Sequence, residues 1–197
     1  SVIYSISLHV ALPILTEFTL EGISNIQGDF QCIDYFYVKE FVMPFIRVAG
    51  DMTIALNSGS VNTAAEIEFP KLQEIGGTLT LGTNKNANNI TFPLLKKILG
   101  SCSVTTYKLK NDIEFTNLES IGTDGADAQI KFEIEATNIL CPKLKTINGK
   151  FDIATSSFMF DMEVDKVSYP NVESISENLS ITCPYSDFGS NGILSID

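Results

Sequence analysis

The sequence is poor in the residues that bind nucleic acid and that carry acid–base catalysis. Its 197 residues include no tryptophan, one histidine (His9) and one arginine (Arg47). Lys and Arg together number 13 against 24 Asp and Glu, which gives a formal charge of −11 at pH 7. Nucleic acids and anionic membrane surfaces are held mainly by clustered Lys and Arg, so neither is expected as a partner. No apolar run approaches the ~20 residues that cross a bilayer, so no membrane span is expected in this segment.

The shortage of histidine also limits the chemistry that the chain can perform. A Ser–His or Cys–His pair needs a base, and His9 stands alone on an apolar stretch. The sequence contains no cofactor motif and no cysteine spacing typical of a zinc site. We therefore expect no cofactor, no metal and no enzymatic activity.

Residues 1–14 are set apart as a doubtful segment. Ser7–Ile14 resembles the translation of a common sequencing adapter, and the segment has neither the basic start nor the cleavage site of a signal peptide. The alternative is an ordinary first strand of the fold. Residues 15–197 are expected to form a single solenoid domain. Because Gly192–Asp197 begins another copy of the repeat described next, without a polar cap, we expect a fragment of a longer protein.

The sequence is rich in one apolar repeat. The pattern F-P-x-L-x-x-I-x-G-x-L-x-I recurs in about seven divergent copies, within a chain that is 44% hydrophobic and only 19% charged. The anchors that begin the copies are Leu20, Val42, Phe69, Phe92, Phe115, Cys141 and Tyr169. They are spaced by 22 to 28 residues, which is the length of a solenoid coil and far below that of an independent domain.

Each part of the pattern has a structural meaning. Residues before each anchor alternate with period two, as in Ile67–Phe69, and so does the later stretch, as in Thr78–Leu81. Each coil is therefore expected to carry at least two strands. The intervening P-x-L-x-x-I is expected to form a corner or a single helical turn. Glycines stand at the same place in five copies, where we expect left-handed or tightly turned backbone: Gly28, Gly50, Gly77, Gly100 and Gly149.

A single coil cannot fold alone, and this predicts the architecture. About five inward side chains contribute on the order of 10 kcal/mol on burial, whereas ordering some ~25 backbones costs at least twice that. Neighbouring coils must supply the missing contacts and pair their equivalent strands in parallel. The expected fold is mostly β, a parallel β-helix or leucine-rich-repeat-like solenoid of about seven coils.

The repeat is similar to that of the receptor L domain family, the right-handed β-helix modules that form ligand-binding parts of insulin-type and epidermal-growth-factor-type receptors. Related coils occur in fungal cell-wall proteins and in leucine-rich surface proteins of gut bacteria. The resemblance covers about Leu20 to Ile181 and is best over Phe69–Leu81 and Val48–Leu56. It implies right-handed coils and an extracellular or cell-surface recognition module without enzymatic activity. The small number of cysteines favours a microbial surface protein over an animal receptor.

The cysteines are not expected to form disulfides. Cys32, Cys102 and Cys141 occupy slots that other copies fill with Leu, Ile, Val or Phe, and they lie far apart along the stack. We expect them to be buried free thiols that act as small hydrophobic residues. Cys183 follows the last clear strand and is the one expected to be most exposed.

Two groups of residues are candidates for binding a ligand. One is a set of outward hydroxyl side chains on the later strands: Thr78, Thr80, Ser101 and Ser103. The other is a set of aromatic side chains in the connections: Tyr35, Tyr37, Phe158, Phe160 and Tyr185. Such loop residues either fold back as satellite core clusters or form a contact patch, and both alternatives stay open. The longer insertions all follow the later strand, so these loops should share one edge of the stack.

The expected function is a non-catalytic recognition or adhesion module, extracellular or at the cell surface, that binds a protein or glycan through one strand face or loop edge. One alternative is a carbohydrate-active β-helix enzyme, for which the stacked Asp29 and Asp51 are an acidic pair of the right kind. A solvated face explains this pair more simply. The other alternative is a purely structural spacer within a surface protein.

Overall fold

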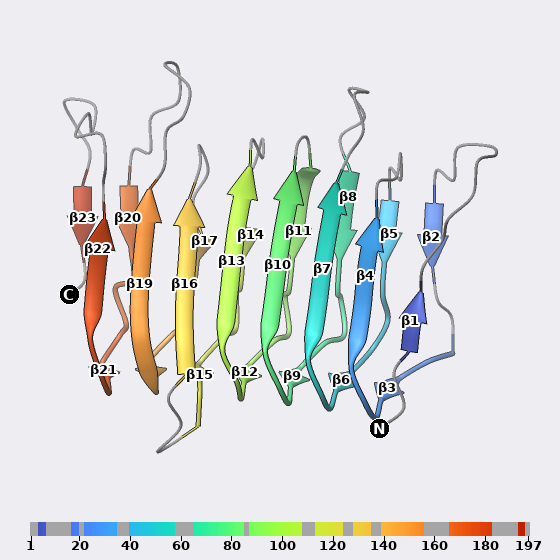
Figure 1. Cartoon of the computed structure of the whole chain (residues 1–197), viewed down its shortest axis with the longest axis horizontal. Coiled ribbons are helices and arrows are strands. Elements are labelled where there is room, and N and C mark those ends of the chain that lie inside the picture. The colour runs from blue at the N-terminus through green and yellow to red at the C-terminus, as the bar shows by residue number, and fades with distance from the viewer. Residues whose placement is uncertain are drawn as a thin grey trace.

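The protein is an elongated stack of coils built from three parallel β-sheets (Figure 1). The computed structural model describes residues 4–6, 17–19, 22–34, 40–57, 65–84, 87–107, 113–123, 128–134, 139–155, 166–182 and 193–195. Every regular element in these ranges is a strand, and, apart from one separate pair near the C-terminal end, successive strands go to the three sheets in turn. The described residues form no helix with the length and apolar character that crossing a bilayer requires.

The strands are short on two sides of the coil and longer on the third. Sheet A holds β1 (Tyr4–Ile6), β4 (Phe30–Asp34), β7 (Met52–Asn57), β10 (Leu79–Asn84), β13 (Cys102–Tyr107), β16 (Ala128–Ile134), β19 (Gly149–Thr155) and β22 (Leu179–Thr182). Sheet B holds β2 (Glu17–Thr19), β5 (Glu40–Val42), β8 (Ala65–Glu68), β11 (Ala87–Thr91), β14 (Ile113–Glu114) and β17 (Ile139–Leu140). Sheet C holds β3 (Asn25–Ile26), β6 (Arg47–Val48), β9 (Glu74–Ile75), β12 (Lys97–Ile98), β15 (Ser120–Ile121), β18 (Thr146–Ile147) and β21 (Ser174–Ile175). A separate parallel pair joins β20 (Lys166–Ser168) and β23 (Ile193–Ser195).

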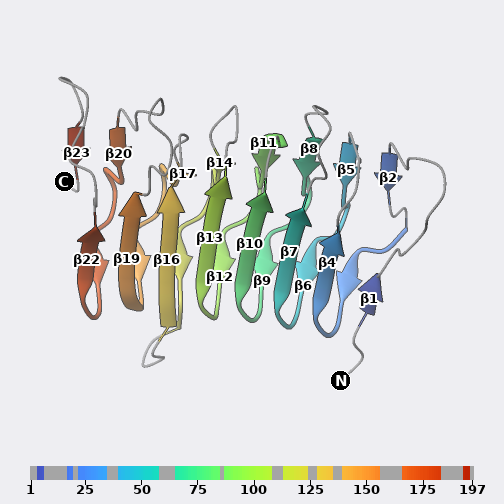
Figure 2. The ribbon, with the colours of Figure 1, turned by 45° about the horizontal axis from the view of Figure 1, so that its top comes forward.

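The coils wind in a right-handed sense. In Figure 1 the strands of sheet A point upward in front, and those of sheet B run back down behind them while the chain advances from right to left. Figure 2 shows the same order, because sheet B rises into view when the top comes forward. The predicted class, a mostly β parallel solenoid, is confirmed. The sheets hold eight, six and seven strands, so the coil count differs slightly with the side that is counted.

Each coil carries a third strand that the sequence pattern did not predict. The P-x part of the repeat forms a turn, but the last two residues of L-x-x-I form a short strand of sheet C, such as Glu74–Ile75. Of the two expected conformations, a corner and a single helical turn, the hydrogen bonds exclude the helical turn. Within the coil, Leu72 N reaches Phe69 O only at 3.4 Å, whereas Gln73 N donates to Ile46 O of the preceding coil at 2.8 Å. Bonds between coils therefore decide the backbone conformation.

The second copy of the repeat is anchored one residue later than the sequence suggested. Met43 is fully buried, and its N donates to Glu68 O at 2.9 Å, as Phe69 N donates to Thr91 O at 3.1 Å. Val42, the predicted anchor, is partly exposed and pairs with the outward Glu68. From Met43 to the buried Phe45 this coil has one residue fewer than later coils have between the anchor and the buried leucine. For that reason the sequence pattern placed the anchor one residue too early.

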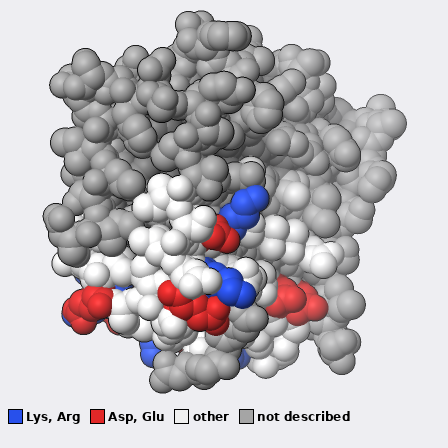
Figure 3. Space-filling model, turned by 60° about the vertical axis from the view of Figure 1, so that its left-hand side comes forward, with Lys and Arg blue, Asp and Glu red and all other residues white. Residues whose placement is uncertain are grey.

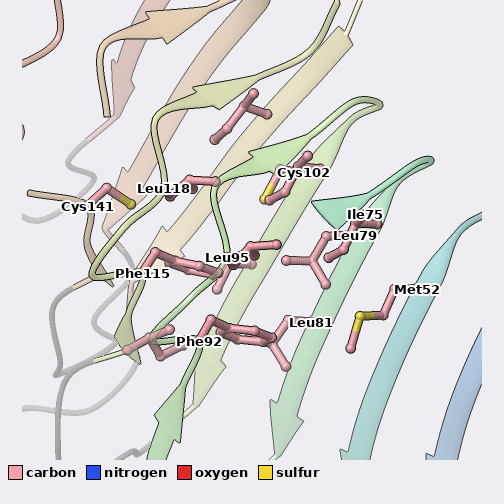
Figure 4. Close-up of a cluster of buried hydrophobic side chains, with 14 of the residues drawn as sticks. Met52, Ile75, Leu79, Leu81, Phe92, Leu95, Cys102, Phe115, Leu118 and Cys141 are labelled. Atoms are coloured by element: carbon pink, nitrogen blue, oxygen red, sulfur yellow. The ribbon is translucent and has the colours of Figure 1, made fainter. Parts of the chain in front are cut away.

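The core consists of columns that receive one side chain from each coil. The rings of Phe69, Phe92 and Phe115 stack in parallel with centroids 4.9 Å apart, which matches the spacing of paired strands. Figure 4 shows Phe92 and Phe115 in this column. Cys102 and Cys141 are buried in the core as free thiols, as predicted, while Cys32 is only partly buried against it. Cys183 lies outside the described residues.

The repeated glycines mostly serve close packing of backbones and not left-handed conformations. Of the five, only Gly149 has a positive φ, of 149°. Gly50, Gly77 and Gly100 stack directly, and the N of Gly77 donates to the O of Gly50 at 2.9 Å. A Cβ on residue 77 would lie 2.8 Å from the carbonyl carbon of Gly50, which is closer than side chains approach. The column thus needs glycine because neighbouring coils leave no space there.

Candidate functional site

The outward face of sheet A carries a regular row of hydroxyl groups. Thr53 pairs with Thr80, and Thr80 with Ser103, so their side chains stand about 4.8 Å apart along the stack. Thr80 is exposed and the other two are half-buried. Gln31 precedes Thr53 in this row, which continues beyond Ser103 as Lys131, Asp152 and Ser180. An uncharged hydrogen-bonding segment is therefore followed by a charged one.

Thr78 and Ser101, the other predicted hydroxyl residues, belong to a second row at the start of the same strands. This row holds the coils together. The Asp51 N–H donates to Asp29 Oδ1 at 2.9 Å, and the Thr78 N–H donates to Asp51 Oδ1 at 2.7 Å. Further along, the Gln129 N–H donates to Ser101 Oγ at 2.9 Å. The structure thus places Thr80 and Ser103 in the row on the strand face, and Thr78 and Ser101 in the row whose hydrogen bonds join the coils.

These bonds give the acidic pair a structural explanation. Asp29 and Asp51 each use one carboxylate oxygen to accept a backbone N–H from the following coil. Carboxylates in this arrangement satisfy main-chain donors at a corner where the sheet ladder begins. Among the residues that the structure describes, no group of three His, Cys, Asp or Glu side chains is placed to hold a metal ion.

The predicted aromatic ligand residues lie outside the described residues. This applies to Tyr35, Tyr37, Phe158, Phe160 and Tyr185. The two alternatives for these side chains, packing back onto the core or forming a contact patch, both stay predictions.

A second candidate surface, which the sequence did not reveal, lies at the corner between sheets B and C. A shallow hollow of about 420 Å³ is lined by Glu119, Pro142, Lys143, Lys145 and Asn171. These residues come from three successive coils, since Lys145 N donates to Glu119 O of the preceding coil at 2.9 Å. The repeat contains a signal for this surface. The residues on either side of each buried leucine must point outward, and Lys143 and Lys145 flank the buried Leu144.

Polar contacts between coils hold the side chains around the hollow. Lys143 Nζ donates to Asn117 Oδ1 at 2.6 Å, and Lys145 Nζ lies 3.2 Å from Glu173 Oε1. Asn171 Nδ2 donates to the carbonyl oxygen of Pro142. Figure 3 shows acidic and basic side chains next to one another on the described part of the face toward the C-terminal end.

The core contains ionisable groups that burial keeps neutral. Burial raises the pKa of the Cys102 thiol to about 12. It also raises the pKa values of Cys141 and Tyr169 well above their ordinary ranges, with smaller contributions from the neighbouring thiols. Because a thiolate is the reactive form of cysteine, these two thiols are unsuited to nucleophilic chemistry. The hydroxyl of Tyr169 is buried without a hydrogen-bond partner.

The fold is established by the observed strand pairing, and comparison with known proteins adds nothing to it. The likeness to receptor L domains accordingly stays a prediction from the repeat. No family model, no curated protein and no solved structure matches the chain.

Proposed function

We propose that the chain is a non-catalytic recognition module, secreted or at the cell surface, that holds a protein or glycan ligand on the outward face of sheet A. The observation that carries the proposal is the row formed by Thr53, Thr80 and Ser103. The similarity of the repeat to receptor L domains supports the same role and an extracellular location. Within this proposal, the flat strand face is the ligand surface and the loop edge is an extension of it.

The physical case rests on preorganised hydrogen bonding. Each hydroxyl can both donate and accept, and its short side chain loses little rotational freedom on binding. The backbones beneath are fixed by ladder bonds on both sides, since β10 pairs with both β7 and β13. A ligand therefore meets donors and acceptors that are already in position, which reduces the cost of association. Lys131 and Asp152, further along the row, would set its orientation.

The test is binding on arrays of glycans and of cell-surface proteins, followed by paired variants. Thr80→Val together with Ser103→Ala removes two hydroxyls and keeps the strand shape. With about 0.5–1.5 kcal/mol for each hydrogen bond, affinity should fall about tenfold. Thr91→Val is the matched control, because Thr91 is a half-buried residue of β11 on sheet B. It should leave binding unchanged.

Three outcomes would count against the proposal. Release of a sugar product from any array glycan would indicate the enzyme alternative, and Asp29→Asn or Asp51→Asn should then abolish the release. Absence of binding on both arrays would favour a structural spacer. Equal losses in the sheet A variant and the Thr91 control would show that the hydroxyl row does not contact the ligand.

A further inference from the structure

Two outward rows of sheet A are uncharged and carry short side chains on three consecutive coils. The first is the hydroxyl row. The second lies two residues further along β7, β10 and β13 and consists of Ala55, Gly82 and Thr105. On β16 the same rows hold Lys131 and Glu133, so the charged part of the face begins there. Because the chain has a formal charge of −11, an anionic ligand is disfavoured, whereas an uncharged ligand meets three coils without the cost of desolvating a charge.

The second row leaves open space beside the hydroxyls. Ala55 and Gly82 pair with each other and are half-buried, and a Cβ built on residue 82 would meet no atom within 4 Å. The two rows are about 7 Å apart, because a strand advances by about 3.4 Å per residue. A ligand as wide as one sugar ring can therefore lie over Ala55 and Gly82 and still reach the hydroxyl row.

The spacing of the coils matches the repeat of an extended glycan. Neighbouring strands are about 4.8 Å apart, and the stacked phenylalanine rings of the core have centroids 4.9 Å apart. In a β-1,4-linked glycan, successive sugar rings advance by nearly this distance, and each ring has hydroxyls on both of its edges. One sugar can thus meet one coil. A polypeptide strand cannot keep this register, because the side chains on one of its faces repeat at about 7 Å.

We propose that the ligand of this face is an uncharged, extended β-1,4-linked glycan, which lies along the solenoid axis with one sugar unit on each of the coils of β7, β10 and β13. This inference rests on the proposed function and names its ligand class. The sugar rings lie over Ala55 and Gly82, and their hydroxyls bond to the hydroxyl row, whose side chains both donate and accept. Since the face is flat and solvated, the affinity for a trisaccharide should be on the order of millimolar.

The experiment is an NMR titration of the isotope-labelled chain with β-1,4-linked glucose oligomers of two to six units. The amide signals of Thr53, Thr80 and Ser103 should shift. Affinity should rise about threefold from two units to three, the effect of about one solvated hydrogen bond, and by less than about twofold for each unit beyond three. The α-1,4-linked hexamer is a curved chain, so fewer of its units can meet the coils. It should bind at least about fivefold more weakly than the β-1,4-linked hexamer.

Two variants and their matched controls test where the glycan lies. Gly82→Leu fills the open space and should weaken trisaccharide binding at least about tenfold, and Thr80→Val should weaken it about threefold. Gly82 has ordinary strand backbone without a positive φ, so a leucine is compatible with the fold. Ser174→Leu, at an exposed residue of β21 on sheet C, and Thr91→Val on sheet B should both leave the affinity unchanged. Circular dichroism checks that each variant is folded, and Thr80→Val carries the test if Gly82→Leu is not.

Several results would overturn this inference. They are an affinity independent of oligomer length, equal binding of the two hexamers, and the same loss from Ser174→Leu as from Gly82→Leu. The inference also fails, while the proposed ligand face stands, if a cell-surface protein binds and is weakened by Thr80→Val with Ser103→Ala but no glucose oligomer binds. Absence of binding to every glycan and protein would refute both.

Discussion

Replacing Tyr169 by phenylalanine should stabilise the protein, because the hydroxyl of this tyrosine is desolvated on folding and gains no partner in return. The side chain is 0% exposed, and its oxygen has no hydrogen-bond partner. The ring itself is well placed. It packs edge-on against Phe151, with centroids 5.5 Å apart, and obliquely against Phe132 at 6.0 Å. Phenylalanine keeps these ring contacts.

The expected gain follows from the cost of an unsatisfied buried hydroxyl, about 1–3 kcal/mol. Loss of the oxygen's own packing contacts subtracts a few tenths of a kcal/mol. A net increase in the free energy of unfolding of about 1–2 kcal/mol should result. For a chain of this size that corresponds to a rise in Tm of about 2–8 °C.

The assay is urea denaturation followed by circular dichroism, with amide hydrogen exchange at β18 and β19 to detect the change if the terminal coils unfold separately. Phe92→Tyr is the reverse control. Phe92 is buried between Phe69 and Phe115, so an added hydroxyl should destabilise the fold. A Tyr169→Phe variant less stable than the parent by about 1 kcal/mol or more would refute the reasoning, because the hydroxyl would then have to make a favourable bond.

The pH dependence provides a second readout. Burial, and to a smaller degree the nearby thiols of Cys141 and Cys102, raises the pKa of Tyr169 well above its ordinary value of 10.0. Below the unfolded pKa the phenol is neutral in both states, and the stability of the fold is fully present. As pH rises from the unfolded pKa towards the folded pKa, ionisation favours the unfolded chain and stability is lost. Because the phenylalanine variant has no phenol to ionise, its advantage over the parent should grow above about pH 10. An advantage that stays constant to about pH 11 would contradict the burial of this group.

Three further predictions concern the glycine column, the corner carboxylates and the core thiols. Gly77→Ala should lower the free energy of unfolding by about 2 kcal/mol or more, since its Cβ would meet the backbone of Gly50 at 2.8 Å. A Cβ at Gly82 would meet open space, so Gly82→Ala should change the free energy of unfolding in urea by less than about 1 kcal/mol. Equal losses for Gly77→Ala and Gly82→Ala would exclude the close-packing explanation. Asp51→Ala should lower the free energy of unfolding by about 1 kcal/mol, because it removes the acceptor for the N–H of the next coil. Asp51→Asn keeps an acceptor and should leave stability nearly unchanged. The reverse order would point to a role for the charge itself. Burial raises the pKa of Cys102 to about 12 and that of Cys141 well above its ordinary range. Both thiols should therefore resist alkylation by iodoacetamide at about pH 8 until the chain is unfolded. Mass spectrometry of the treated native protein checks this, and labelling of either cysteine would contradict it.

The sequence predicted the parts of the fold that depend on side-chain alternation. Period-two stretches such as Thr78–Leu81 distinguish inward from outward residues, so the parallel stacking and the burial of Cys102 followed directly. Features that depend on contacts between coils were not predictable in this way. The strand at Glu74–Ile75 is too short to show a period, and its hydrogen bonds lie in neighbouring coils.

The candidate surfaces show the same division. Thr80 and Ser103 were identified because strand periodicity fixes their outward direction and their common row. Lys143 and Lys145 were not, because they occupy the variable positions of the repeat. Their relation to Glu119 and Asn171 becomes visible only when the coils are stacked. For the repeated glycines, the predicted turned backbone is present as bends, but the close approach of the next coil was not predicted, because a single coil does not show it.

The side-chain bonds at the corners of sheet A have a direction. Asp29 accepts from the coil that follows it, and Asp51 and Ser101 do the same. The backbone bonds of the glycine column have the same polarity, with the acceptor always in the earlier coil. At the anchors the direction is reversed, because Phe69 N donates to Thr91 O of the following coil. Each coil therefore depends on both of its neighbours for its hydrogen bonds.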